Sequence, residues 1–492
     1  MQLFINTFKL SYIDFTHRIY YNIFVKNQQK EVFILKTAVR SINMTDGSLW
    51  DKILFYALPI AATGILQQLF NAADIAVVGN FTGDRGEAAM AAVGANSPII
   101  GLIVNAFIGI SLGSNVVIAK AVGHGDSNVI KKAIHTSVLI ALIIGIFVSV
   151  FGEIFAEQIL LSQNVPEDVI DMAVLYFRVY MTGVPVILLY NFESAIFRGI
   201  GNTKTPLAAL TCSGLLNVLL NLFFVCVLHM TVNGVALATV ISNAASSALL
   251  FIALLKNDAD NGMAKLKLSE LKIDAPILKN ILRIGVPAGI QSAVFSFANI
   301  IIQGAINSLG TIVMAASSAA FNIETFAYYV FNSFSQACTT FTGQNYGAEK
   351  IDRCKKSFAL CYLEGIIATA AAIGIILLFG HQILSVFNPN PEVIKIGYDR
   401  LVIIFSAYFF SLSYEVMSGY MRGFGISLPP ALLTMIGICG VRITWIRLIF
   451  PKEPTFRCIM TAFPISLALT SLLILFALIC THPAKKALNK KL

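Results

Sequence analysis

The stretch FRGIGNTKTP, residues 197–206, returns 224 positions later as MRGFGISLPP, residues 421–430. Four residues keep their places in both copies, as Arg198, Gly199, Gly201 and Pro206 in the first and Arg422, Gly423, Gly425 and Pro430 in the second. Each copy lies between two long apolar segments. Such a repeat indicates that the chain contains two copies of one helical unit, as many membrane transporters do.

Three further landmarks repeat in the same order. Pro59 and Pro287 are 228 positions apart in the sequence, and the other two pairs are 224 positions apart, namely Gly123 with Gly347 and Lys131-Lys132 with Lys355-Lys356. A nearly constant distance over most of the chain is unlikely to arise by chance. Each copy contains six apolar segments, an even number, so the two copies cross a membrane in the same direction. The repeat therefore predicts two halves related by an axis along the membrane normal.

The composition places these segments in a membrane. Only 12% of the 492 residues are charged, 57% are hydrophobic, and the mean hydropathy is +0.77, whereas soluble domains carry about 25% charged residues. A membrane-spanning helix needs ~20 mostly apolar residues, and such segments lie at about 53–80, 89–118, 133–155, 170–196, 205–228, 233–255, 284–308, 312–342, 357–380, 393–418, 428–448 and 459–480. We predict an all-α integral membrane protein of about twelve transmembrane helices in two six-helix lobes related by pseudo-two-fold symmetry.

The loops fix the expected orientation and domain limits. Lysine and arginine gather in alternate loops and in the basic tail, and loops 156–168, 229–233 and 381–391 have none. This asymmetry predicts that both termini are cytoplasmic. The expected parts are a cytoplasmic extension at 1–43, an N-lobe at 44–256, a cytoplasmic linker at 257–282 and a C-lobe at 283–492. The extension lacks a signal peptide and matches nothing in the repeat, which favours Met44 as the start.

Several functional classes find no support in the sequence. The net charge of +9 resides in loops without the aromatic–basic interleaving of RNA-binding proteins, so we expect no nucleic-acid partner. The eight cysteines form no CxxC pair and the six histidines no HExxH motif, so neither a disulfide framework nor a metal site is indicated. We also find no GxSxG or paired-aspartate signature, and we expect neither an enzyme nor a cofactor.

Ordered motifs along the chain resemble one transporter family, and they are LPIAATGILQQLFNAADIAVVGNF (58–81), IGISLGSNVVIAKAVGHGD (108–126), LLNVLLNLFFV (215–225), GVALATVIS (234–242) and FTGQNYGAEK (341–350), together with the two repeat copies. They are similar to the multidrug and toxic compound extrusion (MATE) family of bacterial efflux transporters. The resemblance implies a monomeric secondary transporter of the bacterial cytoplasmic (inner) membrane. Such a protein exports small organic cationic or drug-like compounds by antiport with protons or sodium, through an alternating-access central cavity and without ATP.

Asp74 is the strongest candidate for ion coupling, because an acid inside a membrane span is costly and usually functional. Gln67, Asn71 and Asp74 are spaced to share one helix face, where a carboxylate among amide oxygens can take a proton or hold sodium, the one metal we consider. The resemblance adds Asn217, Asn221 and Thr239 to this site. The alternatives are an aspartate that caps a broken helix or pairs with an arginine, and asparagines that only join helices.

The second half does not repeat this chemistry. The repeat partner of Asp74 is Ile302, whereas Asn71 keeps its partner in Asn299 and Asn191 corresponds to Glu415. Glu415 matches the tenth-span acid of the family and is a candidate for binding a cationic substrate, and the alternative is a structural pair with Arg422 or Arg442.

An aromatic stripe follows Glu324 in the eighth predicted span, and aromatic faces can hold organic cations. Phe295 stands where another family branch carries an acid. The predicted substrate cavity thus comprises Glu415, Asn191, Asn299, Glu324, Tyr328 and Phe295. The competing function is a flippase for a lipid-linked sugar or polysaccharide precursor, which would need a cationic cavity, and the acids favour cationic cargo instead. A passive channel would need no duplicated unit with unequal acids.

Overall fold

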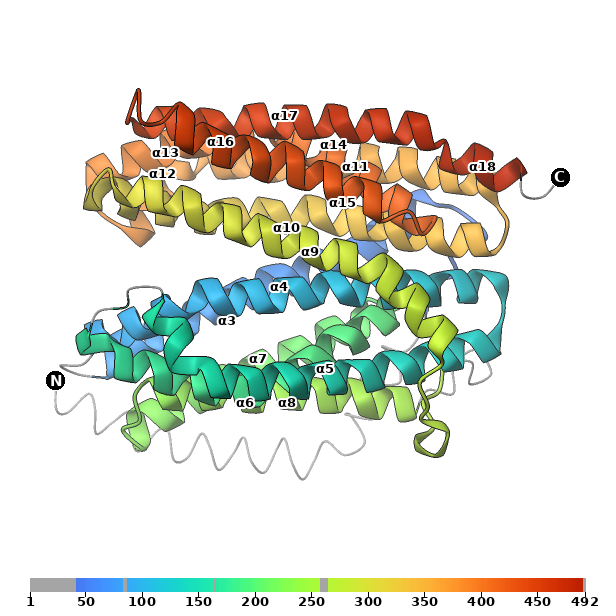
Figure 1. Cartoon of the computed structure of the whole chain (residues 1–492), viewed down its shortest axis with the longest axis horizontal. Coiled ribbons are helices and arrows are strands. Elements are labelled where there is room, and N and C mark those ends of the chain that lie inside the picture. The colour runs from blue at the N-terminus through green and yellow to red at the C-terminus, as the bar shows by residue number, and fades with distance from the viewer. Residues whose placement is uncertain (1–40, 83–85, 163–164, 166, 257–263, 490–492) are drawn as a thin grey trace.

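The computed structural model describes residues 41–82, 86–162, 165, 167–256 and 264–489 (Figure 1). The described part of the first half consists of helices that follow the apolar segments, namely α3 (Trp50–Phe81), α4 (Gly86–His124), α5 (Ser127–Leu161), α6 (Glu167–Gly199), α7 (Lys204–Leu222) with the π-helical turn η3 (Phe223–Val227), and α8 (Val232–Leu255). The predicted extension lies outside the described residues except for its last three positions.

The second half begins after the short 3-10 turn η5 (Leu268–Glu270) and contains α9 (Ala275–Asn307), α10 (Thr311–Gly347), α11 (Ile351–Leu378), α12 (Gly380–Phe387), α13 (Pro391–Phe405), α14 (Tyr408–Gly423), α15 (Leu428–Thr434), the π-helical turn η6 (Met435–Gly440), α16 (Val441–Leu448), α17 (Phe456–Thr481) and α18 (Pro483–Asn489). Side chains cap several helix starts, because the first backbone N–H groups of a helix lack partners within it. Asp126 caps α5 and Asp274 caps α9. The Ile277 N–H and the Lys132 ammonium hold the pKa of Asp274 below its ordinary value.

The repeat seen in the sequence reappears in the helix limits. Helices α5 and α11 begin 224 positions apart, as do α7 with α15 and α8 with α17, and α6 and α14 end 224 positions apart. The left-handed backbone positions repeat as well. Gly125 (φ 75°) corresponds to Glu349 (φ 60°), and Gly201 (φ 90°) corresponds to Gly425 (φ 82°). Glycine adopts this conformation without steric cost, which explains why Gly201 and Gly425 recur in the two quoted stretches.

Two of the predicted helices are interrupted. The segment predicted at 393–418 forms α13 and α14, which are bent by 46° at Ser406 and Ala407. There the Ala407 N–H donates to the Ile404 carbonyl, so the helix tightens before α14 begins. The segment predicted at 428–448 continues from α15 to α16 through η6. In the described part, ten helices are long and apolar enough to cross a membrane, or eleven if α13 and α14 form one span.

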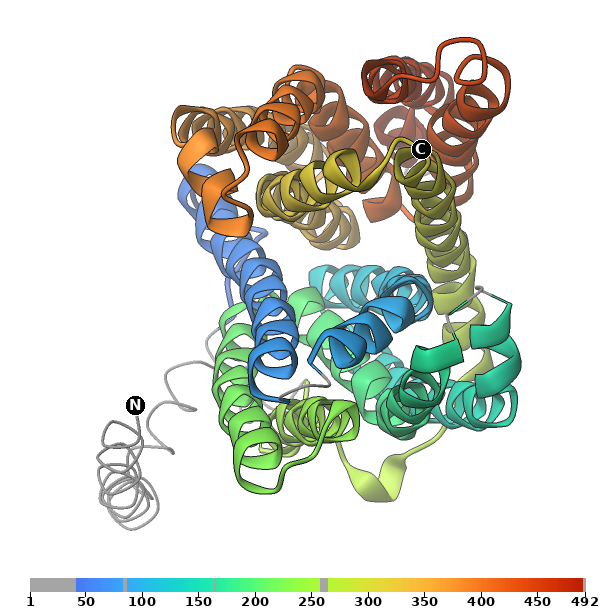
Figure 2. The ribbon, with the colours of Figure 1, turned by 90° about the vertical axis from the view of Figure 1, so that its left-hand side faces the viewer.

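The helices form two lobes, and α3 and α9 lie at the two sides between them (Figure 2). Helix α3 packs on α7 of its own half and on α10 of the other half. Helix α9 mirrors this arrangement, since it packs on α4 of the first half and on α15 and α16 of its own. The first helix of each half therefore contacts both lobes, and a movement of one lobe relative to the other must be accommodated along α3 and α9.

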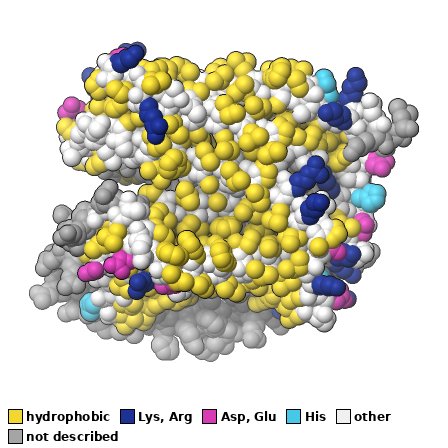
Figure 3. Space-filling model, in the orientation of Figure 1, with side chains coloured by type: hydrophobic (Ala, Val, Ile, Leu, Met, Phe, Trp, Pro, Cys, Tyr) yellow, Lys and Arg dark blue, Asp and Glu magenta, His cyan; other side chains and the backbone are white. Residues whose placement is uncertain are grey.

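The molecular surface fits a bilayer. The visible face is covered with hydrophobic side chains along its middle, and lysine and arginine gather at the right-hand end, near α18 (Figure 3). Large apolar side chains point outward, and Phe147 on α5 exposes 69% of its surface. An exposed apolar surface of this extent is stable only against lipid or a partner. We call the end that carries the loops 125–126 and 348–350 the basic end.

The lobes are joined at the basic end by matched glycines. A Cβ atom on Gly123 of α4 would collide with the Gln344 carbonyl oxygen, and a Cβ atom on Gly347 of α10 would collide with the Lys120 carbonyl oxygen. These two glycines are repeat partners, so α4 and α10 cross in backbone contact at positions that correspond. The Gln344 side chain also donates to the Gly199 carbonyl at 2.9 Å. Only glycine permits so close an approach.

Residues before α3 add to this junction. The Ile42 N–H donates to the Gly201 carbonyl at 3.0 Å, in the N-lobe. Met44 is fully buried, and its carbonyl accepts hydrogen bonds from Asn345 of α10 at 3.2 Å and Arg353 of α11 at 3.1 Å. Residues 42–44 thus touch both lobes.

We predict that Gly123→Ala weakens the export that the family resemblance implies. The added methyl group forces α4 away from α10 and disfavours the state in which the basic end is closed, and overpacking of this kind costs ~1–3 kcal/mol, or about 5- to 150-fold in an equilibrium constant. The measurement is dye efflux at equal protein level. Gly101→Ala is the matched control, because a Cβ atom at Gly101, also on α4, meets nothing within 4 Å. Equal efflux by both variants would contradict the role of the crossing.

Candidate ion and substrate site

Asp74 lies on α3 and is almost completely buried among polar groups of two other helices. Asn221 of α7 donates through Nδ2 to Asp74 Oδ1 at 2.5 Å, and the same amide donates to Asn217 Oδ1 at 3.2 Å. The Thr239 hydroxyl of α8 lies 3.2 Å from Asp74 Oδ2. One acid of α3 thereby connects α7 and α8.

The Thr239 hydroxyl can serve either protonation state of Asp74. It lies 2.9 Å from the Val235 carbonyl as well as 3.2 Å from the carboxylate. A hydroxyl has one hydrogen to donate and can also accept. It donates to an ionised carboxylate, or it donates to Val235 and accepts a hydrogen bond from a protonated Asp74. The change requires only the rotation of one hydrogen.

No positively charged side chain of the described residues pairs with Asp74. Within the described part of the chain, no lysine, arginine or histidine forms an ion pair with it, and the titratable groups that face it are the phenols of Tyr176 and Tyr180 on α6. Asn221 is fully buried, and its Oδ1 has no hydrogen-bond partner among the described residues. A buried carboxylate without a paired cation is costly, so this site is suited to take up a proton or a small cation.

Two of the predicted ligands do not reach the carboxylate. Asn71 is exposed and Gln67 is half-buried, and neither side chain forms a hydrogen bond with another described residue. Asp74 therefore lies with Asn217, Asn221 and Thr239, the residues that the family resemblance predicts. Gln67 and Asn71, which were predicted from helical spacing, are not part of this group.

Glu415 of α14 lies in a buried polar group of the C-lobe. Its Oε2 is 3.4 Å from Nη2 of Arg422, one of the two arginines named as alternatives, and it accepts a hydrogen bond from the Ser335 hydroxyl of α10 at 3.3 Å. The contact with Arg422 is long for an ion pair, and Nε of Arg422 is buried without a hydrogen-bond partner in the described part of the chain. Glu415 is therefore only partly compensated and keeps capacity for a second cation.

Glu324 is compensated fully. Arg400 of α13 donates to it through Nε at 2.6 Å and through Nη2 at 3.0 Å, and its Nη1 donates to Ser317 at 2.6 Å. Both side chains are buried, at 4% and 7% exposure. A two-pronged pair of this kind is a structural element between α10 and α13, which leaves Glu324 no free charge for a substrate.

The other predicted cavity residues are dispersed. Asn191 is buried and donates to the Ile187 carbonyl of its own helix at 2.8 Å. Tyr328 accepts a hydrogen bond from Asn332 and packs edge-on against Phe331. Phe295 lies in the C-lobe core beside Arg442, and Asn299 is half-buried without a side-chain hydrogen bond to a described residue.

Two further acids lie inside the lobes. Glu193 of α6 is fully buried and accepts a hydrogen bond from the Ser247 hydroxyl at 2.9 Å, and its Oε1 has no partner in the described part. Both oxygens of Glu364 on α11 are likewise without a partner there. Neither acid forms an ion pair with a described residue.

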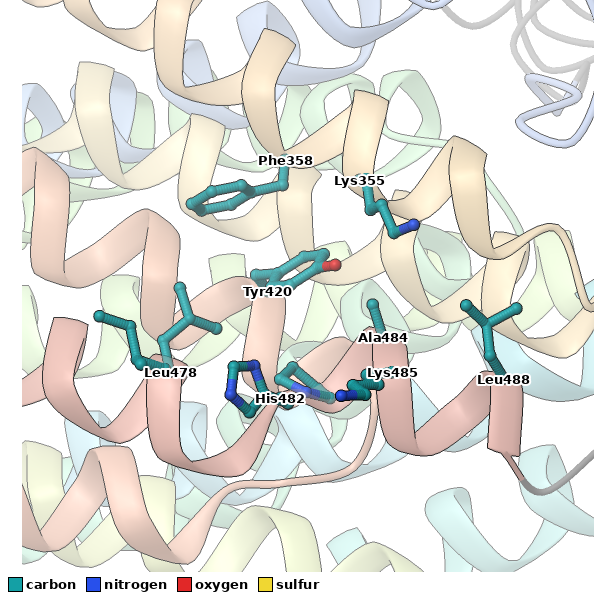
Figure 4. Close-up of a pocket in the computed structure, with 10 residues that line it drawn as sticks. Lys355, Phe358, Tyr420, Leu478, His482, Ala484, Lys485 and Leu488 are labelled. Atoms are coloured by element: carbon teal, nitrogen blue, oxygen red, sulfur yellow. The ribbon is translucent and has the colours of Figure 1, made fainter.

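A cavity lies apart from these acids. It has a volume of about 500 Å³ at the basic end, where α17 meets α18, and its wall includes Lys355, Phe358, Tyr420 and Leu478 (Figure 4). It shares no residue with the Asp74 group.

Sequence reasoning missed the ion-pair partner of Glu324. Arg400 was not considered, because it follows the acid by 76 positions and its repeat counterpart, Tyr176, carries no charge. A search for every charge inside the predicted spans would have found it, since intramembrane charges commonly pair.

Two helical lobes with lipid-facing surfaces and an uncompensated acid in the membrane define a membrane transporter. The chain belongs to the MatE family, whose family model matches residues 59–223 and 287–445. The two matched blocks begin at the paired prolines Pro59 and Pro287. The family is one of multidrug efflux transporters with many transmembrane helices.

Known relatives agree over most of the chain. It is 28% identical over 402 residues to the probable multidrug resistance protein YoeA of Bacillus subtilis, covering 80% of this chain and 86% of that protein. It is 25% identical over 399 residues to the probable multidrug resistance protein NorM of Thermotoga maritima, covering 80% and 84%. An outward-facing structure of a multidrug resistance MATE family transporter shares the fold, with a TM-score of 0.82 at 21% identity over 91% of this chain and 99% of that one.

We predict that Glu324→Gln destabilises the protein. It leaves Arg400 buried without its counter-charge, which costs ~3–5 kcal/mol. The measurement is thermal unfolding of the purified protein in detergent, and the double variant Glu324→Gln with Arg400→Met should recover part of the loss. Asp352→Asn breaks an exposed ion pair with Lys355 and should change little. Unchanged unfolding of Glu324→Gln, with lost export, would return Glu324 to the substrate site.

Proposed function

We propose that this protein is a secondary active exporter of organic cationic or drug-like compounds, driven by antiport with protons or sodium through a central cavity that opens alternately to the two sides of the membrane. The observation that carries the proposal is Asp74, an acid in a membrane helix, held by Asn221 and Thr239 without a counter-charge among the described residues. The coupling ion supplies the positive charge that balances the Asp74 carboxylate.

The geometry favours a proton as that ion. Protonation of Asp74 needs only the change of Thr239 between its two hydrogen-bond partners. Sodium prefers oxygen ligands, and Asn221 presents its Nδ2 to the carboxylate, with Oδ1 turned away. Sodium binding would therefore require this amide to turn over, which would break its bond to Asn217 as well.

Coupling follows from the position of the acid on α3. A bound ion drives transport only if its affinity differs between the inward-facing and outward-facing states. Helix α3 contacts α7 in the N-lobe and α10 in the C-lobe, and Tyr56 near its start lies 2.9 Å from both the Arg198 carbonyl and the Thr340 hydroxyl. A change at Asp74 alters how α3 sits on α7 and α8, and α3 carries that change to the junction between the lobes.

Cationic cargo fits the acids that remain uncompensated. Asp74, Glu193 and Glu364 are buried acids without an ion-pair partner in the described part, and Glu415 is paired only at 3.4 Å. A flippase for a lipid-linked pyrophosphate precursor would need cations at these places. We therefore favour export of cationic compounds over the flippase function.

We predict that Asp74→Asn abolishes ion-coupled export and leaves the protein folded and inserted. An asparagine keeps the size of the side chain but takes up no proton and carries no charge for sodium. Dye efflux is measured in an efflux-deficient bacterial strain at equal protein level, with an imposed proton or sodium gradient. Asp51→Asn, an exposed position on the same helix, is the control. Full efflux by Asp74→Asn would exclude this acid as the coupling site.

We predict that Glu415→Gln weakens export selectively for strongly cationic compounds, because it removes the partly compensated charge of the C-lobe. The measurement compares efflux of a dicationic dye with that of a neutral one in the same cells. Glu392→Gln changes an exposed acid at the start of α13 and serves as control. An equal loss for both dyes would identify Glu415 as a structural partner of Arg422.

A further inference from the structure

Arg442 of α16 is a buried charge that the proposed transport cycle does not use. Its side chain is 2% exposed and lies inside the C-lobe, between α9 and α17. Nε donates to the Ser466 hydroxyl at 3.0 Å. The guanidinium carbon is 4.1 Å from the ring centre of Phe463 and 5.7 Å from that of Phe295.

This arginine has no anionic partner in the described part of the chain. The charged and titratable groups that face it are Tyr414, Cys439, Arg400 and Glu324. Glu324 is the one carboxylate among them, and both of its oxygens are engaged by Arg400. Arg400 also lies over Phe463, at 5.7 Å. The cluster of Glu324, Arg400 and Arg442 therefore carries two positive charges and one negative charge.

The contacts of Arg442 do not balance its burial. Removing an ion from water costs more, even after relaxation, than a cation–π contact returns. Nε is the one guanidinium nitrogen with a hydrogen bond to a described residue. The two Nη atoms form none in the described part, so their donor capacity is free for an acceptor that the protein does not supply.

The repeat gives this position a meaning. Phe463 corresponds to Thr239 and Ser466 to Ser242, each 224 positions apart, on the matched helices α17 and α8. Thr239 contacts Asp74 and Phe463 contacts Arg442. Corresponding positions on α8 and α17 thus contact an uncompensated acid in one lobe and an uncompensated base in the other.

We propose that Arg442 is the centre of an anion-binding site in the C-lobe, with Phe463 and Phe295 as its aromatic walls. The ligand is a small anion that accepts hydrogen bonds from the Nη atoms, either an inorganic halide or the carboxylate of an exported compound. The site is distinct from the Asp74 site and stands without the proposed antiport. A carboxylate ligand would extend the exported compounds to those that carry both charges.

Tryptophan fluorescence tests the proposal directly. The chain has two tryptophans, and Trp445 is three residues from Arg442 on the same helix, so Trp50→Phe leaves one reporter beside the site. Iodide is both a halide and a quencher. In the purified Trp50→Phe protein we expect iodide quenching that saturates with concentration, and no saturation with the neutral quencher acrylamide.

The matched variants locate the site. Arg442→Gln should turn iodide quenching into a linear dependence, Arg442→Lys should retain saturation, and Arg447→Gln, which removes an exposed arginine two residues beyond Trp445, should leave it unchanged. Competition by chloride but not benzoate assigns an inorganic anion, and tighter competition by benzoate assigns the carboxylate of a substrate.

Linear iodide quenching in the Trp50→Phe protein would overturn the proposal even if no Arg442 variant folds. So would equal saturation in Arg442→Gln. Because binding is measured on purified protein without an ion gradient, a failed Asp74 experiment leaves this result unaffected.

Discussion

An ionised side chain inside a membrane must be compensated by another charge or by polar groups, and this constraint organises the interior of the protein. Arg400 compensates Glu324 with two short hydrogen bonds, and Arg422 partly compensates Glu415. Asp74 and Arg442 are different, because each lies among neutral partners. The fully paired charges hold helices together, and the incompletely paired ones are those to which we assign the proposed ion and anion sites.

Backbone contact determines how the lobes meet. At the basic end, α4 and α10 approach so closely that only glycine fits at positions 123 and 347. Helices α3 and α9 contact both lobes at the sides. Since the crossing is made by corresponding residues of the two repeats, one geometry supplies both sides of the contact. A separation of the lobes at this end must therefore be accommodated along α3 and α9, and α3 carries Asp74.

The fold could be predicted from the sequence because its signals are long and redundant: the apolar segments recur, and the repeated glycines mark positions where the backbone needs φ above zero or a close approach. The site could be predicted only in part. Helical spacing placed Gln67 and Asn71 with Asp74, yet Asn71 is exposed and Gln67 is half-buried, and neither contacts the carboxylate through a hydrogen bond in the described part. Glu324 seemed free because its partner Arg400 is distant in sequence, and spacing within one helix says nothing about such contacts between helices.

The segment before α3 links the two lobes through its backbone, with Ile42 bonded to the loop after α6 and Met44 bonded to α10 and α11. Lys350 lies 2.6 Å from Asp46 in the same region, and this pair is exposed to solvent. In the proposed alternating-access cycle, this segment would have to release one lobe whenever the basic end opens. Because salt screens exposed ion pairs, a rise in ionic strength on that side weakens the Lys350–Asp46 contact, whereas the buried Met44 contacts are screened much less.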